Sequence, residues 1–190
     1  MINYTWDLPK GSTLWKTALG RALLDNWQIS GLSTFASGTP VNVTFTTTDG
    51  ADITGGGDTI RATGATGNVP TVNGDPNLPS GQQGLLTWFN TSVFSRPARG
   101  NPGNSSKDIV RGPGINNSDV TLFKNVPLAG GKRRLQLRWE IYNVFNHTQF
   151  ATVDAAARFD AQGNQVNARF GQVITTRAPR VMQVAIRVVF

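Results

Sequence analysis

The chain has 190 residues and a formal net charge of +7, yet only 15% of its residues are charged, against about 25% in a typical soluble domain. It carries 21 glycines and 10 prolines, a mixture that disfavours a helical protein and favours strands joined by long loops. The basic residues are scattered, so we do not expect nucleic-acid binding. The absence of cysteine excludes disulfides and thiolate metal sites, and the single histidine, His147, excludes a multi-histidine metal centre within this chain. We expect no cofactor.

The first two elements differ in their hydrophobic period. Residues 2–8 alternate between apolar and polar side chains, which predicts a half-buried strand. Residues 13–25 place apolar side chains three and four positions apart, which predicts a short amphipathic helix. Ser12 or Thr13 is its expected N-cap, and we interpret the helix as a connector.

Alternation returns after the helix. A strand is predicted from Trp27 onward, interrupted at residues 38–40 by a Gly-Thr-Pro kink or bulge. It continues through residues 41–46. Residues 47–115 then show no sustained period and are rich in Gly, Asn, Asp, Thr and Pro, so they predict a long loop with an ordered island at residues 86–94.

The C-terminal part predicts three more strands. Residues 117–128 and 134–145 form a hairpin around a tight turn at residues 129–133. Residues 147–179 are loop-like, and residues 180–190 alternate up to the terminal Phe190.

The strands predicted over residues 117–128, 134–145 and 180–190 each place polar and apolar side chains on opposite sides. The apolar side is predicted to face lipid, and its members are Leu135, Leu137, Trp139, Ile141, Met182, Val184, Ile186 and Val188. The polar side is predicted to face a water-filled lumen, and its members are Asp119, Arg138, Glu140, Gln183 and Arg187.

Three features favour a membrane barrel over a soluble sandwich. The predicted strands are about 9–12 residues long, enough to cross a bilayer when tilted. Connections alternate between short and long, as they do when turns face the periplasm and loops face outside. The chain also ends on an aromatic residue. We therefore predict an all-β, antiparallel, up-and-down transmembrane barrel segment of about five strands.

This segment is an incomplete barrel, because bacterial barrels need at least eight strands. Its topology follows from the connection lengths. The 129–133 turn and the helix at 13–25 are placed in the periplasm, and the long loops 47–115 and 147–179 outside the cell. The sequence contains no run of 18 apolar residues, so it predicts no transmembrane helix.

Several motifs, in this order, resemble the late barrel of Oar-like TonB-dependent outer-membrane transporters. They span nearly the whole chain: Trp27-Gln28-Ile29-Ser30-Gly31, Ser37-Gly38-Thr39-Pro40, Trp88-Phe89-Asn90-Thr91-Ser92-Val93-Phe94, Arg111-Gly112-Pro113-Gly114, Lys124-Asn125-Val126-Pro127-Leu128, Asn143-Val144-Phe145-Asn146-His147-Thr148-Gln149-Phe150, Phe170-Gly171-Gln172-Val173 and Arg177-Ala178-Pro179-Arg180.

The resemblance implies that residues 1–190 are the C-terminal part of a barrel domain of about 22 strands, in the bacterial outer membrane. The expected function is uptake or export of an unidentified substrate. Expected partners are outer-membrane lipid, the remaining barrel strands and plug, the barrel-assembly machinery, and TonB through N-terminal segments that this chain lacks. Phe190 resembles the terminal aromatic signal for barrel assembly.

Other parts of the sequence carry weaker signals for a site. Trp88, Phe89 and Phe94 could contact a loop ligand, although anchoring of the loop onto the barrel rim is the favoured interpretation. Carboxylates within residues 47–60 suggest calcium only by their density. Nucleophile–base sets and phosphate loops are missing from the sequence, so we expect a non-enzyme. The main alternative is a secreted soluble β-sandwich or carbohydrate-binding module.

Overall fold

A computed structural model describes the chain except for residues 52, 54–68, 80 and 129–132. Two compact units are described separately. Unit 1 comprises Met1–Ala36, Ile115–Gln149 and Ala178–Phe190, and unit 2 comprises Ser37–Gly114 and Phe150–Arg177. The tight turn expected at 129–133 lies, apart from Arg133, outside the described residues. Among the described residues no helix has the length and apolar character needed to cross a membrane.

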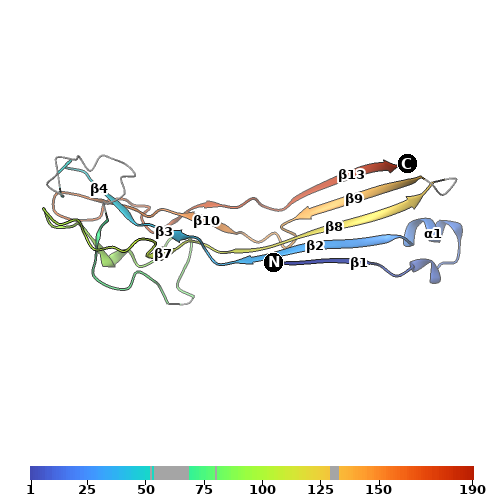
Figure 1. Cartoon of the computed structure of the whole chain (residues 1–190), viewed down its shortest axis with the longest axis horizontal. Helices are drawn as coiled ribbons and strands as arrows, with labels where there is room; N and C mark the ends of the chain where they lie inside the picture. Colours follow the sequence, from blue (N-terminus) through green and yellow to red (C-terminus); the bar gives the residue numbers. More distant parts are fainter. Residues whose placement is uncertain (52, 54–68, 80, 129–132) are drawn as a thin grey trace. The chain divides into compact units, whose positions relative to one another are not determined.

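Unit 1 is built on one five-stranded sheet, coloured from blue to red in Figure 1. Its strands follow the order β1 (Ile2–Asp7), β2 (Trp27–Ala36), β8 (Ile115–Pro127), β9 (Arg134–Tyr142) and β13 (Val181–Val189). Every neighbouring pair is antiparallel. Each strand therefore pairs with the next sheet strand along the chain, which confirms the up-and-down path and the count of five.

The helix before β2 is shorter than expected. A 3₁₀ turn, η1 (Gly11–Thr13), precedes α1 (Ala18–Leu24). The N-cap is Thr17, whose hydroxyl accepts a hydrogen bond from the Gly20 amide at 3.0 Å. The expected cap at Ser12 or Thr13 was wrong, because Ser12 donates its amide and its hydroxyl to the Asp25 carboxylate, at 2.9 and 2.7 Å. The amide of Ser12 is the main reason that the pKa of Asp25 is lowered.

The strand expected over residues 134–145 ends three residues early. Asn143 and Asn146 adopt left-handed backbone angles, with φ of 52° and 50°, a region that Asn enters more easily than most residues. The chain therefore turns after Tyr142. Phe145, placed on the apolar side of the strand by its parity, instead lies in the turn with 75% of its surface exposed.

Unit 2 is assembled from both long loops, and it is more ordered than the sequence predicted. Besides the short continuation of β2, its described residues form seven short strands and a 3₁₀ turn: β4 (Thr44–Thr47), β5 (Thr71–Val72), η2 (Thr91–Val93), β6 (Phe94–Ser95), β7 (Val110–Arg111), β10 (Phe150–Val153), β11 (Ala156–Phe159) and β12 (Val173–Thr176). The region 147–179, expected to be loop, thus supplies three strands. The pairing of β11 with β4 is parallel, unlike the antiparallel sheet of unit 1.

The interruption after β2 is real and divides what the sequence predicted as one strand. At Gly38 a Cβ atom would collide with the carbonyl oxygen of Gly112, so only glycine allows this close approach. The chain then forms β3 (Pro40–Val41), which pairs with β7, and a separate β4. Val43 and Phe45 keep the parity expected for one apolar face, and both are buried.

Unit 2 has a core of its own. Nine buried side chains form it, drawn from both long loops and from the segment before the first of them: Val43, Phe45, Ile53, Phe89, Phe94, Val110, Ala157, Phe159 and Phe170. The rings of Phe89, Phe94 and Phe170 meet edge to face, with centroids 5.3–5.8 Å apart, the arrangement that aromatic pairs prefer. These contacts join residues that are far apart along the chain.

Candidate functional site

The polar face of the five-stranded sheet carries the charged side chains of its strands, with the exception of Lys124. Glu140 lies opposite Thr121 on β8 and opposite Gln183 on β13. Arg138 and Arg187 follow the same parity on β9 and β13. Since directly paired residues share a face of an antiparallel sheet, the register places all five predicted polar residues, including Asp119, on one face.

Glu140 is the centre of this polar network. Its side chain is 6% exposed and accepts a hydrogen bond from the Tyr142 hydroxyl at 3.1 Å. It also accepts one from the Gln183 amide and forms an ion pair with Arg138. The carboxylate is thus surrounded by donors, which stabilise its charged form. With these bonds made, Glu140 is suited to hold a fixed negative charge rather than to transfer a proton.

Three further contacts involve Arg138 and Asp119, the other charged residues of this part of the face. The Arg138 guanidinium lies 5.2 Å from the centroid of the Phe123 ring, a cation–π distance. Asp119 accepts hydrogen bonds from the Asn143 amide at 2.9 Å and from the Asn117 side chain at 2.8 Å. Asp119 therefore holds the turn that ends β9. The sequence had not assigned Tyr142 or Asn143 to the network, although the parity of Tyr142 already placed it on this face.

The opposite face of the sheet is apolar. Its four cross-strand pairs between β9 and β13 are Leu135 with Val188, Leu137 with Ile186, Trp139 with Val184, and Ile141 with Met182. All eight predicted apolar residues thus share one face. That face is not covered in unit 1, because Val184 and Ile186 are 73% and 67% exposed.

Lys124 is a charged residue on the otherwise apolar side of β8 and β9. It was not among the site residues predicted from the sequence. It pairs with Trp27 and Leu137, yet only 4% of its surface is exposed. Its ammonium group donates to the carbonyl oxygen of Asp25 and lies 5.2 Å from the Trp27 ring centroid. Counting parity along β8 would have revealed a lysine at an apolar position.

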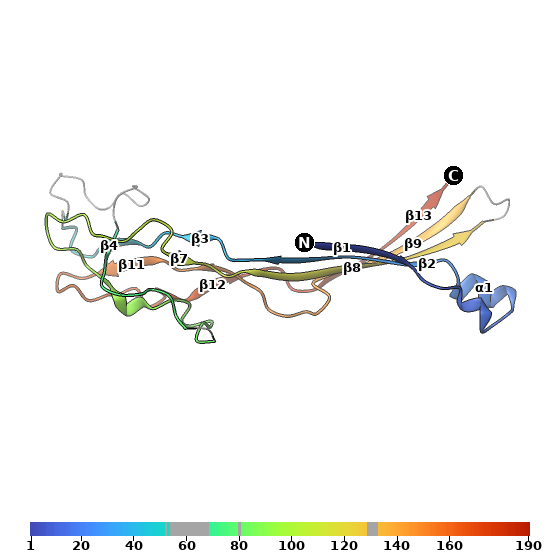
Figure 2. The same ribbon diagram turned by 60° about the horizontal axis from the view of Figure 1, so that its bottom comes forward.

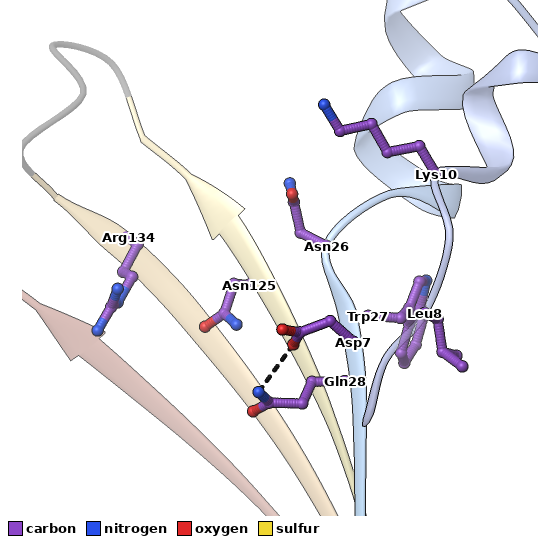
Figure 3. Close-up of a pocket in the computed structure, with 8 residues that line it drawn as sticks. All are labelled: Asp7, Leu8, Lys10, Asn26, Trp27, Gln28, Asn125 and Arg134. Atoms are coloured by element: carbon purple, nitrogen blue, oxygen red, sulfur yellow. Dashed lines mark hydrogen bonds between the residues drawn. The ribbon is translucent and has the colours of Figure 1, made fainter. Parts of the chain in front are cut away.

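A pocket opens at the end of the sheet next to the 3₁₀ turn (Figure 3). Its volume is about 320 Å³, and its lining is mostly polar: Asp7, Leu8, Lys10, Asn26, Trp27, Gln28, Asn125 and Arg134. The Gln28 side chain donates to Asp7 at 2.8 Å, so the one carboxylate in the pocket already has a partner. Lys10 and Arg134 give the lining a net positive charge.

Comparison with known proteins identifies the family. The model of the outer membrane beta barrel domain matches residues 1–183. The chain belongs to this family. No curated protein and no solved structure matches it.

As an outer membrane beta barrel domain, the chain belongs in the bacterial outer membrane. Its two-faced sheet is the geometry that such a domain requires, with one face for lipid and one for water. The soluble sandwich would instead bury the apolar face against a second sheet, whereas in unit 1 the β13 side chains of that face are exposed. The five strands do not close on themselves, since β1 and β13 are the two edges of the described sheet.

The aromatic loop residues lie inside the core of unit 2. Phe89 and Phe94 are 1% and 5% exposed, so neither ring is positioned to touch a ligand. Trp88 is partly buried, donates its indole N–H to the Arg111 carbonyl at 2.8 Å, and contacts the Phe150 ring edge-on. These contacts hold segments of unit 2 to one another, and anchoring onto the barrel rim stays a prediction.

The suggested calcium loop is only partly described. Asp49 forms an ion pair with Arg96 at 2.8 Å, and the hydrogen bond from Arg96 is the main cause of its lowered pKa. Asp52, Asp58 and residues 55–57 lie outside the described residues. Within the part of the chain that the structure describes, no three acidic or histidine side chains are grouped to hold a metal.

Proposed function

We propose that this chain is the C-terminal part of a TonB-dependent transporter barrel that moves an unidentified substrate across the outer membrane. One observation carries the proposal: an up-and-down sheet has one face that is apolar across β9 and β13 and, on its other face, a network of fixed charges around Glu140. The ordered series of motifs that resembles Oar-like transporters supports the narrower assignment. The polar face would line the lumen through which substrate passes.

The proposal assigns a partner to each surface of the sheet. The eight apolar residues of β9 and β13 contact outer-membrane lipid. The remaining strands of the barrel pair along the edges β1 and β13, because an open edge in lipid would leave backbone groups unsatisfied at a cost of several kcal/mol each. The plug fills the lumen against the polar face. TonB acts through residues outside this chain.

The proposal places the two ends of the sheet in different compartments. The loops that form unit 2 face the outside and carry whatever ligand selectivity this part of the barrel has. The end with α1 and Phe190 faces the periplasm. Phe190 is 86% exposed, with the Arg133 guanidinium 5.8 Å from its ring centroid. Its exposure is compatible with recognition by the barrel-assembly machinery.

Uptake measurements test the transporter proposal. Cells with and without the protein would be compared for accumulation of candidate nutrients, each with intact TonB, without TonB, and with a protonophore. We expect accumulation of at least one substrate to require the protein, TonB and the proton gradient together. Accumulation that needs the protein but is insensitive to both TonB and protonophore would make it a passive pore instead.

Surface proteolysis tests the orientation. Trypsin added to intact cells should cut after Lys107, which is exposed in unit 2, and should spare Arg133, which directly precedes β9 in unit 1. Permeabilised cells serve as the control in which both sites are reachable. Cleavage at Arg133 with protection of Lys107 in intact cells would invert the topology.

A further inference from the structure

The segment of residues 10–25 exposes more apolar surface than a connector in water should. Leu14, Trp15, Leu19 and Leu23 are 91%, 45%, 61% and 53% exposed. Single exposed apolar residues are ordinary, but four large ones within ten positions form a patch that usually marks an interaction surface.

Two hydrogen bonds attach the segment to side chains on the apolar face of the sheet. The indole N–H of Trp27 donates to the Leu23 carbonyl at 2.8 Å, and the ammonium group of Lys124 donates to the Asp25 carbonyl. Trp27 and Lys124 are cross-strand partners on the apolar face. Figure 2 shows that β9 and β13 bend to one side of the sheet and that α1 lies on the other side. The exposed patch therefore continues the apolar face.

Charge and aromatic residues at this end suit a membrane surface. Lys16 and Arg21 are exposed on the same segment, and on α1 Arg21 lies roughly opposite Leu19, because two residues span about 200° of a helix. Trp6 and Trp27 stand at this end of β1 and β2. Tryptophan is enriched where a membrane meets water, and a helix with one apolar and one basic side binds in that plane.

We propose that residues 10–25 form a membrane-interface anchor. Leu14, Trp15, Leu19 and Leu23 enter the phospholipid leaflet at the periplasmic end of the barrel, while Lys16 and Arg21 remain at its phosphate groups. This inference rests on the proposed lipid contact of the apolar face. Lipid is favoured over a protein partner because the patch is continuous with a face whose solvent is lipid.

Depth measurements on the reconstituted protein test the anchor. This chain contains no cysteine, so one introduced cysteine in it can carry an environment-sensitive fluorophore. Leu19→Cys and its matched control Arg21→Cys probe the two sides of α1. Val184→Cys and Ala185→Cys probe the two faces of the sheet. The complete protein would be folded into phosphatidylethanolamine–phosphatidylglycerol vesicles, with folding checked by heat-modified gel mobility. Lipids brominated near the headgroup would quench positions 19 and 21, and lipids brominated deep in the acyl chain would quench positions 184 and 185.

We expect quenching at position 19 to exceed that at position 21 about threefold, with a similar contrast between positions 184 and 185. Equal, weak quenching at 19 and 21 with the sheet contrast intact would overturn the anchor alone. Shielding of position 19 from aqueous iodide without quenching by brominated lipid would also overturn it, because a protein would then cover the patch. Loss of the contrast between 184 and 185 would overturn the lipid contact of the sheet and the anchor with it.

Discussion

The two units place their large apolar side chains in opposite environments. In unit 1, Val184 and Ile186 stand on an uncovered face, whereas in unit 2 Phe89 and Phe159 are each 1% exposed. Unit 2 makes its own apolar interior, as a water-exposed domain must. Unit 1 makes a surface that only an apolar solvent stabilises. The same residue types are thus packed against one another in unit 2 and left uncovered in unit 1.

The two units also differ in how their backbones are held. In unit 1, β2 and β8 pair over ten consecutive residues, and ladders of this kind continue across the sheet. In unit 2, β3 pairs with β7 and β5 with β6 over only two residues each. Side-chain hydrogen bonds also connect its segments. Arg96, for example, donates to the Asp49 carboxylate and to the carbonyl oxygen of Asp160. Unit 2 therefore depends on side-chain packing, and unit 1 on its ladders and its solvent.

Phe89→Ala should show the largest effect and should be confined to unit 2. Truncating a fully buried phenylalanine costs about 3–5 kcal/mol, and Phe89 contacts two other core rings. We expect faster hydrogen exchange throughout unit 2 and unchanged exchange in β9. Phe145→Ala is the control, since that ring is 75% exposed. Equal loss of protection in both units would show that they fold as one.

Val184→Arg should damage unit 1 without disturbing unit 2. Arginine on a lipid-facing position near the midplane costs about 2–4 kcal/mol. Ala185→Arg is the neighbouring control on the polar face. It lies opposite Arg138, but like charges across a strand cost no more than about 1 kcal/mol. Folding into lipid vesicles, followed by heat-modified gel mobility, measures both variants. Similar losses from the two would contradict the assignment of the faces.

Deletion of Phe190 compares the exposed terminal ring with the buried ring of Phe89 in their effect on stability. Partial burial of a terminal ring in the membrane interface is worth at most about 1.5–3 kcal/mol, less than the loss expected at Phe89. We expect less barrel in the outer membrane, with periplasmic degradation, while the assembled barrel melts nearly as before. Unchanged abundance with a lower melting temperature would make Phe190 an ordinary packing residue.

Acid should loosen unit 2 slightly. The hydrogen bond from Arg96 lowers the pKa of Asp49 below its usual 3.8. A carboxylate whose pKa is depressed by folding stabilises the fold above the unfolded pKa, and this contribution disappears as pH falls through the lower folded value. Hydrogen exchange around Arg96 should thus lose protection below about pH 3.8. In Arg96→Gln this acid-dependent step should be absent; if it persists, other carboxylates cause it.

The sheet and its faces could be predicted from the sequence because strand geometry is local. Successive side chains alternate between faces with a period of two, so the apolar set of Leu135 to Ile141 and the polar set around Glu140 were both visible as parity. The pairing of Glu140 with Gln183 follows once the strands are known to be antiparallel neighbours. The placement of the protein in a membrane also followed, because strand length and connection length are sequence properties.

Only the tertiary structure decided where elements end and which loops form a core. Ser12 did not cap the helix because Asp25, thirteen residues away, binds both of its donors. Phe89 and Phe94 became core residues because Phe170, from the other long loop, packs against them. The parallel pairing of β4 with β11 likewise joins segments that are over a hundred residues apart. Such partners leave no periodic trace in the sequence, because their contacts depend on how distant loops meet.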